Sequence, residues 1–128
     1  MALNILVVDD SETVRSIILK TLTLSGLELN DSLQASNGKE ALALLRDNWV
    51  DLVLTDINMP DMGGVELIEH MKKDEVLKTI PVVVVSTEGS ATRIEELKKK
   101  GVRAYIRKPF TPEKIREVLD DVLGTGHD

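Results

Sequence analysis

The sequence predicts an α/β protein with one parallel β-sheet covered by helices on both faces. Short runs of aliphatic and β-branched residues recur along the chain, as in strands that are buried on both sides. Between them lie segments whose apolar residues stand three and four positions apart, the spacing of one helix face. Strands that alternate with helices form parallel sheets with right-handed crossovers, so a doubly wound sheet of five strands is expected.

The chain has 128 residues, which suits a single domain, with a core expected over about residues 3–123. Hydrophobic residues make up 42% and charged residues 30%, as in an ordered globular protein. With no cysteine, the chain has no disulfide, thiolate nucleophile or cysteine-bound metal. The absence of a signal peptide and of any long apolar run predicts a cytoplasmic protein without membrane contact. The net charge of −6 disfavours direct binding of nucleic acid.

Three strands are expected in the first half of the chain, at residues 5–8, 32–35 and 52–55. The second is weak because its only apolar residues are Leu33 and Ala35. Ser11 is a suitable N-cap for the first helix, and Gly26 a suitable stop. The expected helix faces are Val14, Ile17, Ile18, Thr21 and Leu22 in the first helix, Ala41, Leu44 and Leu45 after Asn37-Gly38, and Leu67, Ile68 and Met71 after Gly63-Gly64.

The second half contains two more strands, at residues 82–85 after Pro81 and at residues 104–107. The helix expected at about residues 91–100 has only Ile94 and Leu97 as substantial apolar anchors, so it should be the least firmly docked. Thr111-Pro112 begin the last helix, which has the clearest amphipathic spacing of the chain. Its apolar residues are Ile115, Val118, Leu119, Val122 and Leu123.

Reactive side chains follow four of the apolar runs: Asp9-Asp10, Asp56, Ser86 and Lys108. Ligands of open parallel sheets bind at the carboxyl ends of the strands, so these groups are expected to meet in one cleft. Three carboxylates, a hydroxyl and an ammonium suit a divalent cation together with a phosphoryl group. Alone, Asp9-Asp10 would be read as a cap of the first helix, where negative charge is favourable; the other strand-end groups favour the cleft.

The chain resembles the receiver domain of two-component response regulators. The resemblance covers nearly the whole chain, and four short motifs in the same order carry it. They are Val7-Val8-Asp9-Asp10-Ser11, the segment from Asp56 to Gly64 (DINMPDMGG), Val85-Ser86, and Lys108-Pro109-Phe110. The family has a flavodoxin-like (βα)5 fold, so the resemblance implies the strand order 2-1-3-4-5.

The resemblance implies that Asp56 accepts a phosphoryl group from a histidine kinase. A carboxylate nucleophile of this kind forms an aspartyl-phosphate. Mg²⁺ is the implied cofactor, with Asp10, Asp56 and the main-chain carbonyl of Asn58 as ligands and Asp9 acting through water. Lys108 matches the family lysine that contacts the phosphoryl oxygens.

Other positions are implied to serve the switch or its rate. Ser86 would donate a hydrogen bond to a phosphoryl oxygen and move inward, and Tyr105 matches the aromatic residue that turns in response. Thr87 departs from the family pattern, which usually has a smaller residue there, and so could narrow the access of the phosphodonor. Asn58 and Glu88 match the residues of motility regulators and are expected to tune hydrolysis of the phosphoryl group.

The chain ends soon after the last expected helix, so we expect no attached output domain and signalling through contacts with another protein. Apart from its own phosphorylation and dephosphorylation, no enzymatic activity is expected. The protein either acts on a downstream target, as in chemotaxis, or is a phosphorelay intermediate that passes phosphate to a histidine phosphotransfer protein. It should be a monomer, or a weak dimer when phosphorylated.

A different class, the aspartate-nucleophile phosphatases and dehalogenases, also places an aspartate at a strand end with Mg²⁺. These enzymes normally carry a second aspartate two residues later as acid/base, but this chain has Asn58 there. A nucleotide- or flavin-binding protein is disfavoured because no glycine-rich phosphate loop follows the first strand.

Overall fold

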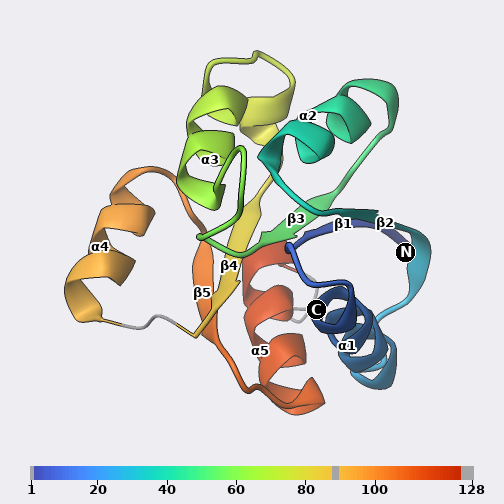
Figure 1. The fold of residues 1–128 in the computed structure, drawn as a ribbon. Helices are drawn as coiled ribbons and strands as arrows, with labels where there is room; N and C mark the ends of the chain where they lie inside the picture. The colour runs from blue at the N-terminus through green and yellow to red at the C-terminus, as the bar shows by residue number, and fades with distance from the viewer. Residues whose placement is uncertain (1, 88–89, 125–128) are drawn as a thin grey trace.

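A computed structural model describes residues 2–87 and 90–124 and shows one parallel sheet in the order β2-β1-β3-β4-β5 (Figure 1). The predicted fold class and strand order are therefore confirmed. The strands are β1 Leu3–Val8, β2 Leu29–Ala35, β3 Leu52–Thr55, β4 Val82–Ser86 and β5 Ala104–Arg107. The helices are α1 Glu12–Leu24, α2 Gly38–Asp47, α3 Gly64–Lys72, α4 Ala91–Lys99 and α5 Pro112–Leu123, with a short 3-10 helix, η1, at Leu77–Thr79.

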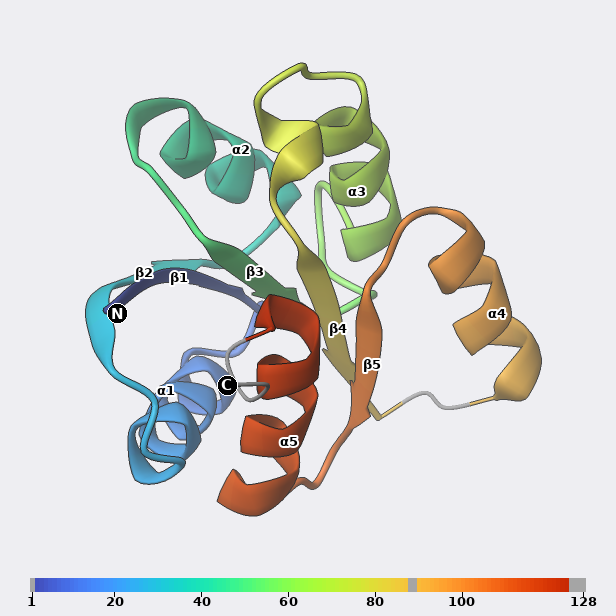
Figure 2. The ribbon, with the colours of Figure 1, turned by 180° about the vertical axis from the view of Figure 1, so that it is seen from behind.

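The sheet separates two hydrophobic cores, because successive side chains of a strand point to opposite faces. Ile5 and Val7 of β1 pack with residues of α1 and α5, whereas Leu6 and Val8 pack with residues of α2, α3 and α4. Figures 1 and 2 show the same division, with α1 and α5 on one side of the sheet. Both faces are covered, which explains why the central strands are apolar along most of their length.

The helix starts follow local capping chemistry. The side chains of Ser11, Asn37 and Thr111 accept hydrogen bonds from main-chain N–H groups three residues later, at 3.2, 3.0 and 3.1 Å. These bonds satisfy donors that have no partner within the helix. Ser90 caps α4 in the same way. The starts of α1, α2, α4 and α5 are thus set by their own sequence, whereas α3 begins after Gly63 without a side-chain cap.

Two local expectations differ from the structure. Strand β2 begins three residues early, at Leu29, because Asn4 of β1 fixes its polar start: the Asn4 side chain accepts from the main-chain N–H of Asp31 at 3.2 Å. This hydrogen bond from a distant part of the chain stabilises the start of β2, where few apolar residues are available. Ile17, expected on the buried face of α1, is 55% exposed, whereas Ile18 and Leu22 of the same predicted face are buried.

Helix α4 is anchored as thinly as its sequence suggests, with Leu97 as its only fully buried residue and Ile94 half-buried.

Within the described part of the chain, no helix combines the length and apolarity that a bilayer crossing requires.

Candidate functional site

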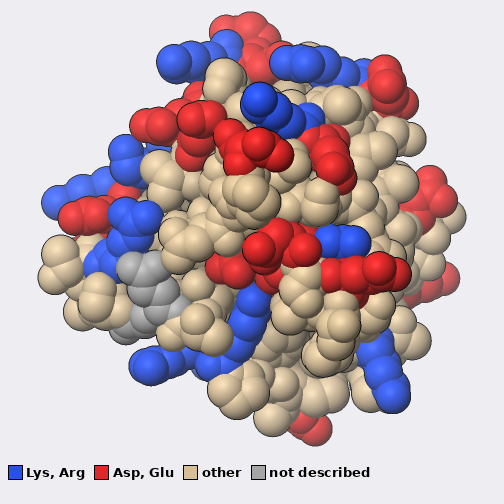
Figure 3. All heavy atoms as spheres, in the orientation of Figure 1, with Lys and Arg blue, Asp and Glu red and all other residues tan. Residues whose placement is uncertain are grey.

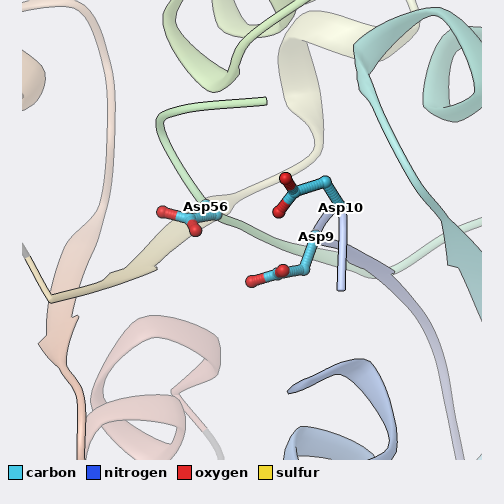
Figure 4. A group of neighbouring side chains, drawn as sticks. All are labelled: Asp9, Asp10 and Asp56. Carbon is cyan, nitrogen blue, oxygen red and sulfur yellow. The ribbon is translucent and has the colours of Figure 1, made fainter. Parts of the chain in front are cut away.

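Three aspartates meet beyond the carboxyl ends of β1 and β3 (Figure 4). Each of Asp9, Asp10 and Asp56 has a carboxylate oxygen within 4.8 Å of the other two. Adjacent pairing of β1 with β3 explains the meeting, since Val8 lies opposite Thr55 and the main-chain N–H of Asp56 donates to the Val8 carbonyl at 3.0 Å. The expected convergence of these aspartates is therefore observed.

Lys108 enters the same cluster from the loop after β5. Its Nζ lies 2.9 Å from Asp9 Oδ2 and 3.5 Å from Asp56 Oδ2. The Lys108 side chain is 17% exposed, so this contact is shielded from much of the solvent. One ammonium thus contacts two of the three carboxylates, and the cluster keeps an excess of negative charge. Acidic side chains gather near the middle of this face of the molecule, with basic ones beside them (Figure 3).

The three aspartates differ in their surroundings. Asp9 is buried, and both its carboxylate oxygens are engaged: Oδ1 accepts from Ser11 N–H at 2.9 Å, and Oδ2 contacts Lys108. Asp10 is exposed, and no hydrogen bond or ion pair reaches its carboxylate from the described residues. Asp10 therefore has the more available oxygens of the two.

Asp56 is held in place by its own loop. Its Oδ1 accepts from the main-chain N–H of Ile57 at 2.7 Å, which leaves Oδ2 toward Lys108. The loop then turns back on itself, and Gly64 N–H donates to the Ile57 carbonyl at 2.7 Å. A Cβ at Gly64 would collide with the Asp56 carbonyl oxygen, so only glycine permits this close approach.

The other predicted site residues lie around the cluster. Ser86, at the end of β4, is 2% exposed, and its carbonyl accepts from Lys108 N–H at 2.9 Å. Thr87 and Asn58 are exposed. Tyr105 is half-buried on β5, opposite Val84. Glu88 lies outside the described residues.

The chemistry of the cluster fits a small, hard divalent cation. Such ions take oxygen ligands, and Mg²⁺ holds them at about 2.1 Å, so two oxygens on opposite sides of the ion stand roughly 4.2 Å apart. The carboxylate oxygens of the three aspartates lie within 4.8 Å of one another, close enough to approach a single ion. Asp10 and Asp56 are the residues that would hold the ion, and water would complete its shell.

Sequence reasoning missed one contact in this region. Arg15 of α1 donates from Nη1 to the main-chain carbonyl of Asp9 at 2.6 Å and from Nε to Gln34 Oε1 at 3.0 Å. The available signal was a basic residue in the first turn of a helix, where the dipole disfavours positive charge.

Comparison with known proteins shows which family has this fold and site. The sequence model of the response regulator receiver domain matches residues 5–120. The chain therefore belongs to the response regulator receiver domain family, whose members accept a phosphoryl group on an aspartate with Mg²⁺. They are signalling proteins rather than enzymes in the usual sense.

Several relatives carry names from chemotaxis. A chemotaxis protein CheY homolog of Campylobacter jejuni is 45% identical over 125 residues, which cover 97% of this chain and 95% of that protein. Chemotaxis protein CheY1 of Helicobacter pylori is 43% identical, covering 96% of this chain and 98% of that protein. This chain is thus CheY-like in both sequence and length.

Solved structures with a similar fold also include chemotaxis proteins. Chemotaxis response regulator CheY4 of Vibrio cholerae has a TM-score of 0.83 at 32% identity, over 95% of this chain and 99% of that chain. The CheX-CheY-BeF3-Mg complex of Borrelia burgdorferi contains a chain with a TM-score of 0.83 at 26% identity, over 94% of this chain and 89% of that chain.

Proposed function

We propose that this protein is a phosphorylation-dependent switch in which Asp56 is the phosphoacceptor. The observation that carries the proposal is the placement of Asp56 Oδ2, which faces Lys108 within a cluster of three carboxylates. Among the described residues, the three aspartates of this cluster are the acidic groups placed to hold a metal ion. A histidine kinase is the proposed phosphodonor, in keeping with membership of the family.

In the proposed reaction, an oxygen of Asp56 forms a bond to phosphorus while the bond between phosphorus and the donor's imidazole nitrogen breaks. The bonding electron pair returns to the imidazole, and the product is an aspartyl-phosphate. Lys108 stabilises the negative charge on the phosphoryl oxygens. It is already 3.5 Å from Asp56 and needs only to leave Asp9. The Ser86 hydroxyl donates to another phosphoryl oxygen.

Mg²⁺, when bound, neutralises charge on the phosphoryl oxygens and so reduces their repulsion from the attacking carboxylate. Asp10, Asp56 and the carbonyl of Asn58 are the proposed ligands, with Asp9 acting through water. Asp9 already uses both carboxylate oxygens, which supports the indirect role. In the resting protein, Lys108 partly compensates the charge that the ion would otherwise neutralise.

Tyr105 and Ser86 are the proposed switch. The Tyr105 hydroxyl is buried, and no described residue forms a hydrogen bond with it. An unpaired buried hydroxyl is costly, so little holds the ring in this orientation. Movement of Ser86 toward the phosphoryl group would leave room for the ring to turn, and α4 could shift cheaply because Leu97 is its main anchor.

The proposed surface for the downstream partner is formed by α4, β5 and α5. Tyr105 lines a hollow of about 800 Å³ there, together with residues of both helices. The hollow combines basic side chains, Lys98 of α4 and Arg103 just before β5, with acidic ones from α5, such as Glu117 and Asp121. A turn of Tyr105 would change this surface directly, which links phosphorylation to binding.

The names of the relatives favour chemotaxis as the pathway. A phosphorelay, in which the phosphoryl group passes to a histidine phosphotransfer protein, is the second candidate. Thr87 lines an apolar groove beside Lys108 together with Ile17 and Phe110, which supports a role of Thr87 in controlling access. Asn58 and Glu88 remain the proposed residues that tune hydrolysis.

The decisive experiment is phosphorylation by acetyl phosphate with Mg²⁺, followed by mass measurement of the intact protein. The native protein should gain one phosphoryl group, and Asp56→Asn should gain none. Asp51→Asn is a matched control that changes an aspartate at the opposite edge of the sheet, and it should behave like the native protein. A phosphoryl gain by Asp56→Asn would disprove the assignment.

A second measurement tests the metal ligands. Titration calorimetry should show weaker Mg²⁺ binding for Asp10→Ala than for Asp61→Ala, because Asp61 is exposed in the loop after Asn58. Equal effects of the two changes would count against the proposed ligand set.

A further inference from the structure

We infer that Arg15 is a positioning residue for the metal ligand Asp10. This inference rests on the proposed metal site and concerns a residue outside the carboxylate cluster. Arg15 lies in the first helical turn of α1, and its side chain extends back toward the end of β1. There it donates from Nη1 to the Asp9 carbonyl at 2.6 Å.

The bonded carbonyl belongs to the peptide unit that joins Asp9 to Asp10. The orientation of this peptide sets the direction in which the Asp10 side chain leaves the backbone. On its amino side, Asp9 is fixed by the sheet, since its N–H donates to the Ala35 carbonyl at 3.1 Å. Arg15 fixes the other side, and Asp10 is thereby held against the end of β1.

Arg15 is itself held by a second bond. Its Nε donates to Gln34 Oε1 at 3.0 Å, at the end of β2. The guanidinium is a rigid planar fork, so the two bonds together fix its position. An ammonium in its place could not reproduce both bonds from one fork. The arrangement therefore links α1, the end of β1 and the end of β2 at the point where the metal ligand begins.

Asp10 needs such support because the carboxylate has none of its own from the described residues. Asp9 and Asp56 accept main-chain hydrogen bonds at their carboxylates, from Ser11 and Ile57. Asp10 is exposed and close to two other negative charges, which would push its side chain outward. Fixing the peptide before it reduces this freedom. Groups that orient metal ligands usually change metal affinity by tenfold or more when they are removed.

The position and the charge of Arg15 predict opposite effects on Mg²⁺ binding, which makes the inference testable. If Arg15 acted only through its charge, its removal would lessen repulsion of the cation and tighten binding. If it positions Asp10, its removal weakens binding. Gln34→Ala separates the two further, because it loosens the guanidinium without changing any charge.

The experiment is titration calorimetry of Mg²⁺ with the native protein, Arg15→Ala, Arg15→Lys and Gln34→Ala, with unfolding curves to show that each variant is folded. We expect Arg15→Ala to weaken binding about tenfold. Arg15→Lys should also bind more weakly than the native protein, and Gln34→Ala should show a smaller loss in the same direction. In metal-free protein, NMR should show shifted amide signals of Asp10 and Ser11 in Arg15→Ala.

Arg116→Ala is the matched control. Arg116 also donates from Nη1 to a main-chain carbonyl, that of Ser25 at 3.2 Å, and from Nε to a side chain, Asp120 at 3.0 Å, but between α1 and α5. Its loss should lower stability and leave Mg²⁺ affinity unchanged. Unchanged or tighter binding by Arg15→Ala, or native binding by Arg15→Lys, would overturn the inference. Absence of Mg²⁺ binding by the native protein would instead overturn the proposed function.

Discussion

Aspartates lie in contrasting surroundings at the two ends of the parallel strands, called here the amino edge and the carboxyl edge of the sheet. At the amino edge, Asp51 accepts from Asn4 N–H and from the Trp49 indole N–H, both at 2.9 Å. At the carboxyl edge, Asp9, Asp10 and Asp56 lie close together, and Lys108 contacts Asp9 and Asp56. Each Asp51 oxygen is paired with a neutral donor, whereas the other cluster holds mutually repelling charges.

This difference separates a structural carboxylate from a functional one. Asp51 ties β1 to the start of β3, and its bonds stabilise the native state without any ligand. Repulsion among the carboxylates at the carboxyl edge is expected to lower stability, and binding of a cation is expected to relieve it. Ligand sensitivity should therefore be confined to the carboxyl edge.

The largest expected effect is that of Lys108→Ala. The change leaves Asp9 buried without its cationic partner, so we expect a loss of about 3 kcal/mol in the free energy of unfolding when a chelator is present. Mg²⁺ should restore part of this loss, because the ion binds the native cluster. Urea unfolding with and without Mg²⁺ measures both effects. No dependence of the variant's stability on Mg²⁺ would contradict the comparison.

The next effect is at the amino edge. Asp51→Ala removes the acceptor for the Asn4 N–H and the Trp49 indole, so we expect a loss of about 2 kcal/mol in the free energy of unfolding. Mg²⁺ should add the same stabilisation to this variant as to the native protein. Urea unfolding with and without the ion measures it, and a changed Mg²⁺ response would show that the two edges are not independent.

A smaller effect of opposite sign is expected for Asp10→Asn. Without metal, the variant should be more stable by about 1 kcal/mol, since one of three repelling charges is gone and Asp10 is partly screened by solvent. With Mg²⁺, the variant should be less stable than the native protein, because the native protein gains more stability from binding the ion. Thermal unfolding with chelator and with Mg²⁺ is the measurement. If Asp10→Asn destabilised the protein when a chelator is present, the proposed repulsion among the carboxylates would be refuted.

The smallest effect concerns Asp74, whose carboxylate, like that of Asp51, accepts hydrogen bonds from neutral N–H groups. Hydrogen bonds from the main-chain N–H groups of Leu77 and Val76 lower the pKa of the Asp74 carboxyl below its usual 3.8. A lowered pKa in the folded state means that Asp74 stabilises the protein above pH 3.8, and that this contribution is lost as the pH falls through the lowered value.

Asp74→Asn should therefore flatten the acid side of the stability profile slightly. Urea unfolding between neutral pH and the acid limb measures the difference, and the Mg²⁺ response should stay native. An unchanged profile would mean that the two hydrogen bonds do not persist in solution.

Much of the site could be predicted from the sequence because its parts are local. Each reactive residue directly follows an apolar strand, and parallel strands bring their carboxyl ends to one edge. The N-cap Ser11 was likewise predicted from the sequence, and the helix starts at Asn37-Gly38 and Thr111-Pro112 were predicted from the residues found there. By contrast, the residue-by-residue roles came from the family resemblance and stay proposals.

Other features depend on residues far apart in the chain. Strand β2 begins at Leu29 because Asn4 supplies partners that the local pattern lacks. Ile17 fits the apolar spacing of α1, yet the way α1 packs leaves it exposed. The spacing of apolar residues shows which side of a helix faces the core. It does not show which residues on that side are buried by neighbouring elements.

The sequence by itself determined the alternation of strands and helices, the caps, and the types of reactive group at the strand ends, because these depend on neighbours along the chain. Tertiary structure decided which of those groups touch. Lys108 reaches Asp9 across 99 positions of sequence, and Arg15 joins the Asp9 carbonyl to Gln34. Such contacts depend on packing and electrostatics between separate elements, and they arise only when the sheet has assembled.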